Sequence, residues 1–379
     1  MRRLGLGVLV SVLFGLSVAS PGHGIELGDD GELVVSGDFR LRLESDWNSH
    51  RTDGSKRMDR TRARARARVA LDWRTSNALS VGLRLRTGSD ASHQSPHITL
   101  VDFDDNDTGD ADFNFDKWFL KASAQDLWGW AGRNSFPFWK QNELFWDDDV
   151  TPAGLAGGWT CEAADGDRFK VNVGYFSLPV GMRAFAGNLG AAQVVSTLDR
   201  SNTALTLAAG FYGFTSNPND NDARVLRTGN GLRDYAIWVA SGQATLRAAA
   251  RPLTLGVDYM HNAERYSPAD PYAFTNRREN DGFVVSAQWG ATTTRGEWLL
   301  GYWYADVGAL AVNASFAQDD WVRWGSATET EASDLRGHEL RFSYGLGSAG
   351  NIVARLYLVE AITSQQDGTR FRIDYNVKF

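Results

Sequence analysis

Arginine occupies every second position from residue 60 to residue 68, and this alternation is the strongest chemical signal in the chain. The residues between these arginines are small or apolar, and the apolar series continues through Val69, Leu71 and Trp73. Period-two alternation is typical of a β-strand, because successive side chains point to opposite faces. One face of the predicted strand is therefore a column of guanidinium groups, which attract anions.

The arginine face of this strand must be turned away from lipid. If the strand crosses an outer membrane, each arginine that faces lipid near the midplane costs about 2–4 kcal/mol. Several such residues would exceed the ~5–15 kcal/mol by which a typical domain is stable. We therefore expect the arginines to face water. A basic nucleic-acid-binding arm or a soluble sandwich strand would show similar alternation, but the formal net charge of the chain is −7 and the pattern recurs along it.

Two neighbouring strands carry further arginines on the same face. The strand predicted near Glu32–Trp47 precedes the arginine strand, and the strand predicted at 79–86 follows it after a turn at Thr75–Asn77. Because residues opposite each other in antiparallel strands share a face, the three strands predict one inward basic patch. Arg84 and Arg86 are expected level with the last two arginines of the series. The predicted pore-lining set is Arg40, Arg42, Arg62, Arg64, Arg66, Arg68, Arg84 and Arg86, with Asp38, Glu44 and Asp72 as counter-charges.

An acidic stretch at 101–112 is a weak candidate for a metal site. Asp102, Asp104 and Asp107 have some likeness to a calcium-binding loop, but the stretch lacks the glycine and the terminal glutamate of an EF-hand. A solvated surface loop is the preferred interpretation. A loop folded toward the arginines and a cation site are the alternatives.

Histidines and serines form no recognisable catalytic arrangement in the sequence. His93 and His97 lie in a polar stretch without an acid at metal-site spacing, and we interpret both as surface-loop residues. A G-x-S-x-G nucleophile motif is absent. Cys161 is the single cysteine, which precludes an intramolecular disulfide. The sequence therefore predicts neither enzyme activity nor a cofactor.

The chain begins with the features of a secretory signal peptide. Arg2 and Arg3 precede the apolar run Leu4–Val18, and small residues follow it. The run is short for a membrane helix. We expect residues 1–24 to be the signal, with cleavage between residues 20 and 24, and residues 25–379 to form one exported domain.

The exported domain is predicted to be an all-β, antiparallel, up-and-down transmembrane barrel. Alternating segments continue to the end of the chain and fit about 16 strands, within a range of about 14–18. Short turns alternate with long polar stretches near 215–233, 266–280 and 309–335, which is typical of outer-membrane barrels. Gly132–Gly154 is aromatic-rich and too irregular for a strand, so we expect a structured loop that folds over or into the pore.

The last predicted strand, at 368–379, carries a possible assembly signal. Its odd positions from Phe371 to Phe379 are apolar, and the chain ends on an aromatic residue. This pattern resembles the terminal strand by which outer-membrane proteins are recognised by their assembly machinery. Tyr375 and Phe379 are the predicted signal residues.

Several segments together resemble the putative-porin family of bacterial outer-membrane proteins, which is similar to the alginate-export barrels. The resemblance lies mainly in the N-terminal part of the chain. It implies passive transport across the outer membrane of a Gram-negative bacterium and identifies no solute. The segments are SGDFRLRLE at 36–44, DRTRARARARVALDW at 59–73, VGLRLRTGS at 81–89, GRNSFPFW at 132–139 and LFWDDDVTPAGLA at 144–156.

Two transport functions follow from these observations. The first is a porin, a passive diffusion channel for small hydrophilic solutes, with an anion preference from the inward arginines. Because arginine stays charged at accessible pH, this preference is expected to vary little with pH. The alternative is a dedicated channel for an anionic polysaccharide or oligosaccharide, as the alginate-export relatives imply. An adhesin or receptor that uses the long loops is a further class.

The expected partners are outer-membrane lipid, the barrel-assembly machinery and the transported solutes, and no nucleic acid is expected. The sequence leaves open the oligomeric state, the solute and the pore width.

Overall fold

The computed structural model describes residues 24–27, 32–104, 112–163, 166–217, 219–225, 230–247, 251–322 and 332–379. All but the last residue of the predicted signal peptide lies outside these ranges.

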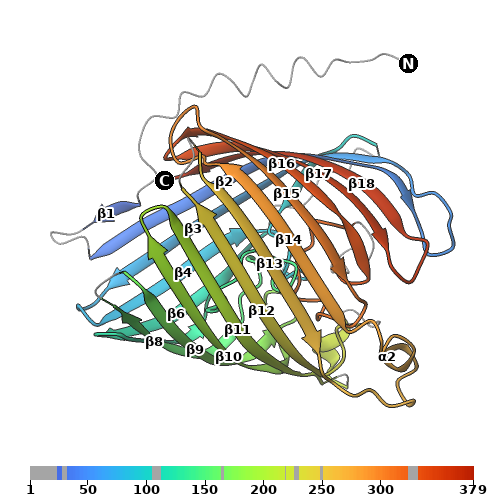
Figure 1. Ribbon diagram of the computed structural model, residues 1–379, viewed down its shortest axis with the longest axis horizontal. Coiled ribbons are helices and arrows are strands. Elements are labelled where there is room, and N and C mark those ends of the chain that lie inside the picture. The colour runs from blue at the N-terminus through green and yellow to red at the C-terminus, as the bar shows by residue number, and fades with distance from the viewer. Residues whose placement is uncertain are drawn as a thin grey trace.

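Within the described ranges, sixteen antiparallel strands close into a barrel (Figure 1). Each barrel strand pairs with the barrel strands before and after it in the chain, and the last strand pairs with the first, which closes the ring. The predicted up-and-down barrel is therefore confirmed. The strands are β2 (Leu33–His50), β3 (Arg60–Arg74), β4 (Leu79–Thr87), β6 (Phe113–Ala124), β7 (Leu127–Arg133), β8 (Ala153–Glu162), β9 (Arg168–Pro179), β10 (Phe185–Arg200), β11 (Thr203–Thr215), β12 (Tyr235–Leu246), β13 (Leu253–Asn262), β14 (Asp281–Gly290), β15 (Trp298–Val307), β16 (Leu335–Gly347), β17 (Gly350–Ala361) and β18 (Asp367–Lys378).

Short elements complete the wall and the connections. Strand β1 (Ile25–Leu27) pairs with the start of β2, and β5 (Ile98–Asp102) pairs with β3 beyond the end of β4. The 3-10 helix η1 (Asn221–Val225) and the helix α2 (Pro271–Thr275) lie in long connections. No helix in the described part of the chain has the length and hydropathy needed to cross a bilayer.

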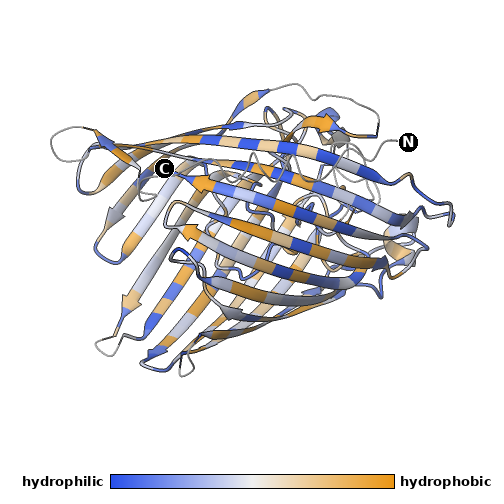
Figure 2. Ribbon diagram, turned by 90° about the horizontal axis from the view of Figure 1, so that it is seen from above, coloured by the Kyte–Doolittle hydropathy of each residue, from blue (hydrophilic) through white to orange (hydrophobic). Residues whose placement is uncertain are grey.

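The alternation of side chains produces the barrel wall. Hydrophobic and hydrophilic residues alternate along many of the strands in Figure 2. On β3 the apolar residues Val69, Leu71 and Trp73 are exposed on the outside, as expected for a surface in contact with lipid. The position of β3 agrees with the arginine strand predicted from the sequence, because the period-two pattern is strongest there.

The two ends of the barrel differ in the length of their connections. Tight turns at 125–126, 201–202 and 348–349 lie at the end that also holds the start of β2 and the end of β18. The connections at the other end include long ones, at 134–152 and 308–334. Short turns at one end and long loops at the other are the arrangement of bacterial outer-membrane barrels.

The barrel lumen contains an apolar core, formed where two connections turn inward. Trp146 of the connection 134–152 stacks on Phe316 of the connection 308–334, with ring centroids 5.5 Å apart. Phe136 stacks in turn on Tyr212, which projects from the inner face of β11. The predicted loop at 132–154 therefore folds into the pore. The expectation of a polar loop at 309–335 was wrong for residues 309–317, which are buried in this core.

Candidate functional site

The inward face of β2, β3 and β4 carries arginines that lie directly opposite one another. Arg86 lies opposite Arg68, whereas Arg84 is displaced from its expected position and lies opposite Ala70. The pairing of β3 with β4 is centred on Asn77, because Arg74 lies opposite Ser80; a centre one residue earlier, at Ser76, would place Arg84 opposite Arg68. The opposed arginine pairs are Arg42–Arg64, Arg40–Arg66 and Arg68–Arg86.

Strands β17 and β18 extend this face across the seam of the barrel. Arg355 projects from β17, and Arg370 and Arg372 project from β18. Together with the inward arginines of β2, β3 and β4, they form a surface that we call the basic wall. The predicted pore-lining set omits these three residues, although Arg370 and Arg372 show the same alternation in the sequence.

Carboxylates between the strands neutralise most of the basic wall. Glu44 is fully buried and contacts Arg62 at 2.5 Å and Arg372 at 2.6 Å. Asp38 contacts two further arginines, and the predicted counter-charge Asp72 forms no ion pair with any described residue. Opposed like charges destabilise a sheet, so these carboxylates permit the arrangement. The other ion pairs of the wall arginines with strand carboxylates are Arg42–Asp374, Arg60–Asp46, Arg64–Glu44, Arg66–Asp38, Arg68–Asp38, Arg84–Asp116, Arg355–Asp374, Arg355–Glu339 and Arg370–Asp46.

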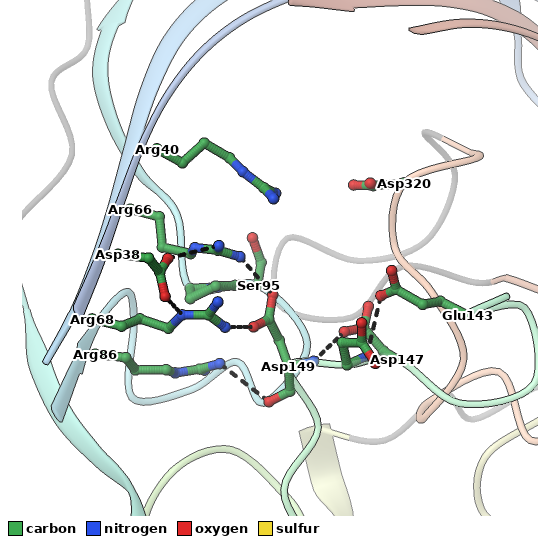
Figure 3. A network of polar contacts seen from close by, with 12 residues as sticks. Asp38, Arg40, Arg66, Arg68, Arg86, Ser95, Glu143, Asp147, Asp149 and Asp320 are labelled. Atoms are coloured by element: carbon green, nitrogen blue, oxygen red, sulfur yellow. Dashed lines mark hydrogen bonds and ion pairs between the residues drawn. The ribbon is translucent and has the colours of Figure 1, made fainter. Parts of the chain in front are cut away.

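An acidic surface of the inward connections faces the basic wall (Figure 3). Asp149 lies 2.7 Å from Arg68, and Asp320 lies 3.2 Å from Arg42. These contacts hold the two connections against the wall. We call this surface the acidic rim; its members are Glu143, Asp147, Asp148, Asp149, Asp319 and Asp320.

Arg40 differs from the other arginines of the predicted set. Its Nε donates to Oδ1 of Asn376 at 2.7 Å, and the side chain of Asn376 is held by Asn351 at 2.8 Å. The terminal nitrogens of Arg40 contact no carboxylate or other acceptor among the described residues, and Figure 3 shows this side chain extending into the space before Asp320. Arg86 also has no carboxylate partner in the described ranges, but it is buried and donates to loop carbonyl groups.

A cavity of about 270 Å³ separates the basic wall from the acidic rim. Arg40, Arg66 and Lys378 line it on the wall side, and His97 borders it from the connection between β4 and β5. A second cavity of about 480 Å³ adjoins it toward the end with the tight turns, where both cavities are lined by Lys378. Opposed charges across a narrow aqueous space can attract and orient a charged solute.

The comparison with known families now decides what kind of barrel this is. The profile of a family described as "Putative porin" matches residues 46–237, which is half of the chain. The chain belongs to the putative-porin family. It is an outer-membrane channel of the porin type, and its location is the bacterial outer membrane.

Solved porin structures share the fold of this porin. OprB of Pseudomonas putida, in its high-pH structure, is similar with a TM-score of 0.60 at 12% identity, over 95% of this chain and 99% of that chain. OmpF of Salmonella typhi, in its complex with daunomycin, is similar with a TM-score of 0.54 at 11% identity, over 94% of this chain and 100% of that chain. At these identities the likeness shows the fold alone. A comparison with curated proteins finds no match.

In this porin five carboxyl groups of the acidic rim fall into two classes. Burial and nearby carboxylates raise the pKa of Glu143 to about 7. Burial likewise raises the pKa values of Asp147 and Asp319 above the usual range. For Asp149 and Asp320, burial opposes ionisation but the adjacent arginines outweigh it, so their pKa values are lowered. The rim therefore holds both ionised carboxylates and carboxyl groups that retain protons.

Both histidines that were interpreted as surface-loop residues lie inside the barrel. His93 is fully buried; its Nε2 lies 2.6 Å from the carbonyl oxygen of Ser315, and its Nδ1 accepts from the backbone N–H of Gly181. His97 borders the cavity, where burial and the surrounding arginines hold its pKa well below the usual value. The surface interpretation was wrong because the polar stretch packs beneath an inward connection.

The weak calcium-loop candidate gains no support from its local geometry. Asp102 ends β5 and accepts from the backbone N–H of Asp104, which itself accepts from the backbone N–H of Thr61 at 2.5 Å. Asp107 lies outside the described residues. No three His, Cys, Asp or Glu side chains are grouped as a metal ion would require anywhere in the described ranges.

The two residues of the predicted assembly signal lie at the seam of the barrel. Phe379 exchanges two backbone hydrogen bonds with Gly37 on β2, each 3.0 Å long. Tyr375 lies opposite Leu41 on the same strand. Their recognition by the assembly machinery stays a prediction.

Proposed function

We propose that this porin is a passive diffusion channel for small hydrophilic solutes, with a preference for anions that is carried chiefly by Arg40. The supporting observation is that Arg40 directs its terminal nitrogens into the cavity without a carboxylate partner among the described residues. Most other arginines of the basic wall have such a partner, so their field is largely cancelled at short range. We propose transport without catalysis.

The acidic rim cancels only part of this preference at neutral pH. Asp149 and Asp320 are engaged by arginines, and the exposed Asp148 is paired with Lys140 at 2.5 Å. The other rim carboxyls have raised pKa values. Arg40 and Lys378 then present the unpaired charge that a passing solute meets.

Small solutes fit this arrangement better than a polysaccharide does. The inward connections leave a cavity of about 270 Å³ beside the basic wall. A polysaccharide channel, the alternative, would require these connections to move out of the lumen. The buried stacking of Trp146 and Phe316 opposes such a movement.

Replacing Arg40 with glutamine is expected to lower the chloride-to-potassium permeability ratio by about threefold or more, because a focused positive charge is lost from the passage. The ratio follows from the reversal potential of the refolded protein in a planar bilayer under a KCl gradient. Arg200→Gln removes the same charge from an exposed turn and should leave the ratio unchanged. An unchanged ratio in the Arg40→Gln variant would remove Arg40 from the mechanism.

The acidic rim makes the expected selectivity depend on pH, in contrast to the expectation from the arginines alone. Glu143 is neutral well below its pKa of about 7 and anionic above it. Raising the pH from about 5.5 to about 8.5 therefore adds negative charge beside the cavity and should lower the anion preference. Reversal potentials measured across this range test the sign. Glu143→Gln should flatten the profile, and a profile that rises with pH would contradict the proposal.

A further inference from the structure

Three residues that line the cavity between the basic wall and the acidic rim each have a buried hydrogen-bond donor without a partner. In the described part of the chain, Nε of Arg66, Nε of Arg355 and Nε2 of His97 are buried atoms without a hydrogen-bond partner. All three residues line this cavity, as does Arg40 with its free terminal nitrogens. Buried polar atoms are almost always satisfied in proteins, and an ion is one common explanation for an exception.

Arg40 is held so that its hydrogen-bonding end faces the cavity. The contact between its Nε and Asn376 fixes the plane of the guanidinium group, and Asn351 fixes Asn376 in turn. Both asparagines also line the cavity. Two terminal nitrogens in one plane form a fork that matches the two oxygens of a planar oxyanion, whereas a spherical halide contacts the fork less completely.

His97 adds a donor without adding charge. Because burial and the arginines keep its pKa well below the usual value, the imidazole is neutral at physiological pH. A neutral imidazole carries one N–H, and Nε2 is free to hold it. The ring therefore offers an uncharged hydrogen-bond donor at the border of the cavity.

We propose that Arg40, oriented by Asn376 and assisted by His97, forms a binding site for a planar oxyanion, a carboxylate or an ion of the same shape. This inference rests on the proposed anion-preferring channel and specifies which anions that channel retains. Chloride passes through the site, and formate, the smallest carboxylate, occupies it. A larger solute would be recognised through its carboxylate group.

The site is tested with formate as the probe and chloride as the current carrier. Chloride conductance in a planar bilayer is titrated with sodium formate at constant ionic strength, and occupancy appears as a saturating fall in current. For Arg40→Lys, which keeps the charge but loses the planar fork, we expect the half-effect concentration to rise about tenfold. The chloride-to-potassium permeability ratio should stay close to that of the wild type.

Two further variants separate the site from a general effect of folding. Asn376→Ala should weaken the formate effect while the anion preference persists, because Arg40 keeps its charge and loses its orientation. Arg200→Lys makes the same chemical change at the end of β10, outside the basic wall, where Arg200 already contacts Asp167, and should leave the formate effect unaltered. Heat-modifiable migration in gels verifies that each variant is a folded barrel.

The outcomes distinguish this inference from the proposed function. If formate causes no saturating fall in the chloride current of the wild type, the oxyanion site is refuted and the anion preference stands. The same conclusion follows if Arg40→Lys and the wild type have the same half-effect concentration for formate. If the wild-type channel shows no anion preference, the proposed function fails, and the response of Arg40→Lys to formate then tests the oxyanion site separately.

Discussion

Replacing Trp146 with alanine should release the inward connection 134–152 and enlarge the conducting space. Trp146 is fully buried; it stacks on Phe136 with ring centroids 4.3 Å apart and packs against Phe316. Its Nε1 also donates to the carbonyl of Val150 at 3.1 Å. Truncating a buried tryptophan costs about 3–5 kcal/mol. This loss of stability should mainly affect the packing of the connection 134–152, because the barrel strands keep their hydrogen bonds to one another.

Single-channel conductance and thermal unfolding in detergent together measure this effect. We expect a larger and noisier conductance for Trp146→Ala, with a weaker anion preference because Asp149 is no longer held against the basic wall. Trp159 faces outward on β8, so Trp159→Ala serves as the matched control and should leave conductance unchanged. A folded Trp146→Ala barrel with wild-type conductance would show that the apolar core does not limit the passage.

Replacing Glu44 with glutamine is expected to produce the second large effect, on stability and selectivity together. The fully buried carboxylate of Glu44 contacts Arg62 and Arg372 and lies 3.9 Å from Arg64. Removing one partner of a buried ion pair leaves uncompensated charge and costs about 3–5 kcal/mol. The same change leaves the basic wall more positive. The surviving channels should therefore prefer anions more strongly than the wild type, the opposite of the effect expected for Arg40→Gln.

Urea unfolding in detergent micelles and reversal potentials in bilayers measure the two consequences separately. Glu162→Gln is the control, because Glu162 pairs with Arg168 in an exposed turn and such pairs contribute little to stability. A Glu44→Gln variant as stable as the wild type would mean that water replaces the lost carboxylate. A reduced anion preference would mean that the field of the wall does not reach the passage.

The barrel could be predicted from the sequence because the alternation of side chains along each strand depends only on neighbouring residues. In β3 each arginine and each intervening residue lies on a face set by its position alone, so the strand and its inward side follow from the alternation. The pairing of strands is less local. The turn after β3 displaced Arg84 from its expected partner, because no residue at 75–78 dictates where a polar turn is centred.

The contents of the lumen could not be predicted by the same rule. The aspartates at 147–149 look like a surface run, and only the fold brings Asp149 to Arg68. One signal was available: β12 and β14 each have apolar residues on both faces in the half nearest the long connections. On β12, Ile237 faces the lumen and Trp238 faces outward, and on β14 Val284 faces the lumen beside the exposed Val285. A strand of this kind requires cover on its inner side, which the inward connections supply.

At the seam of the barrel, the first and last strands of the chain together form the basic wall. The basic wall is built from β2, β3 and β4 near one end of the sequence and from β17 and β18 at the other, whereas the inner faces of β9–β14 support the apolar core. Under the proposed function, solutes therefore meet mainly this part of the barrel, and the apolar core supports it from the other side. Changes of charge at the lumen surface are therefore concentrated where the first and last strands meet, and changes of apolar packing are concentrated in the middle strands and the connections that pack on them.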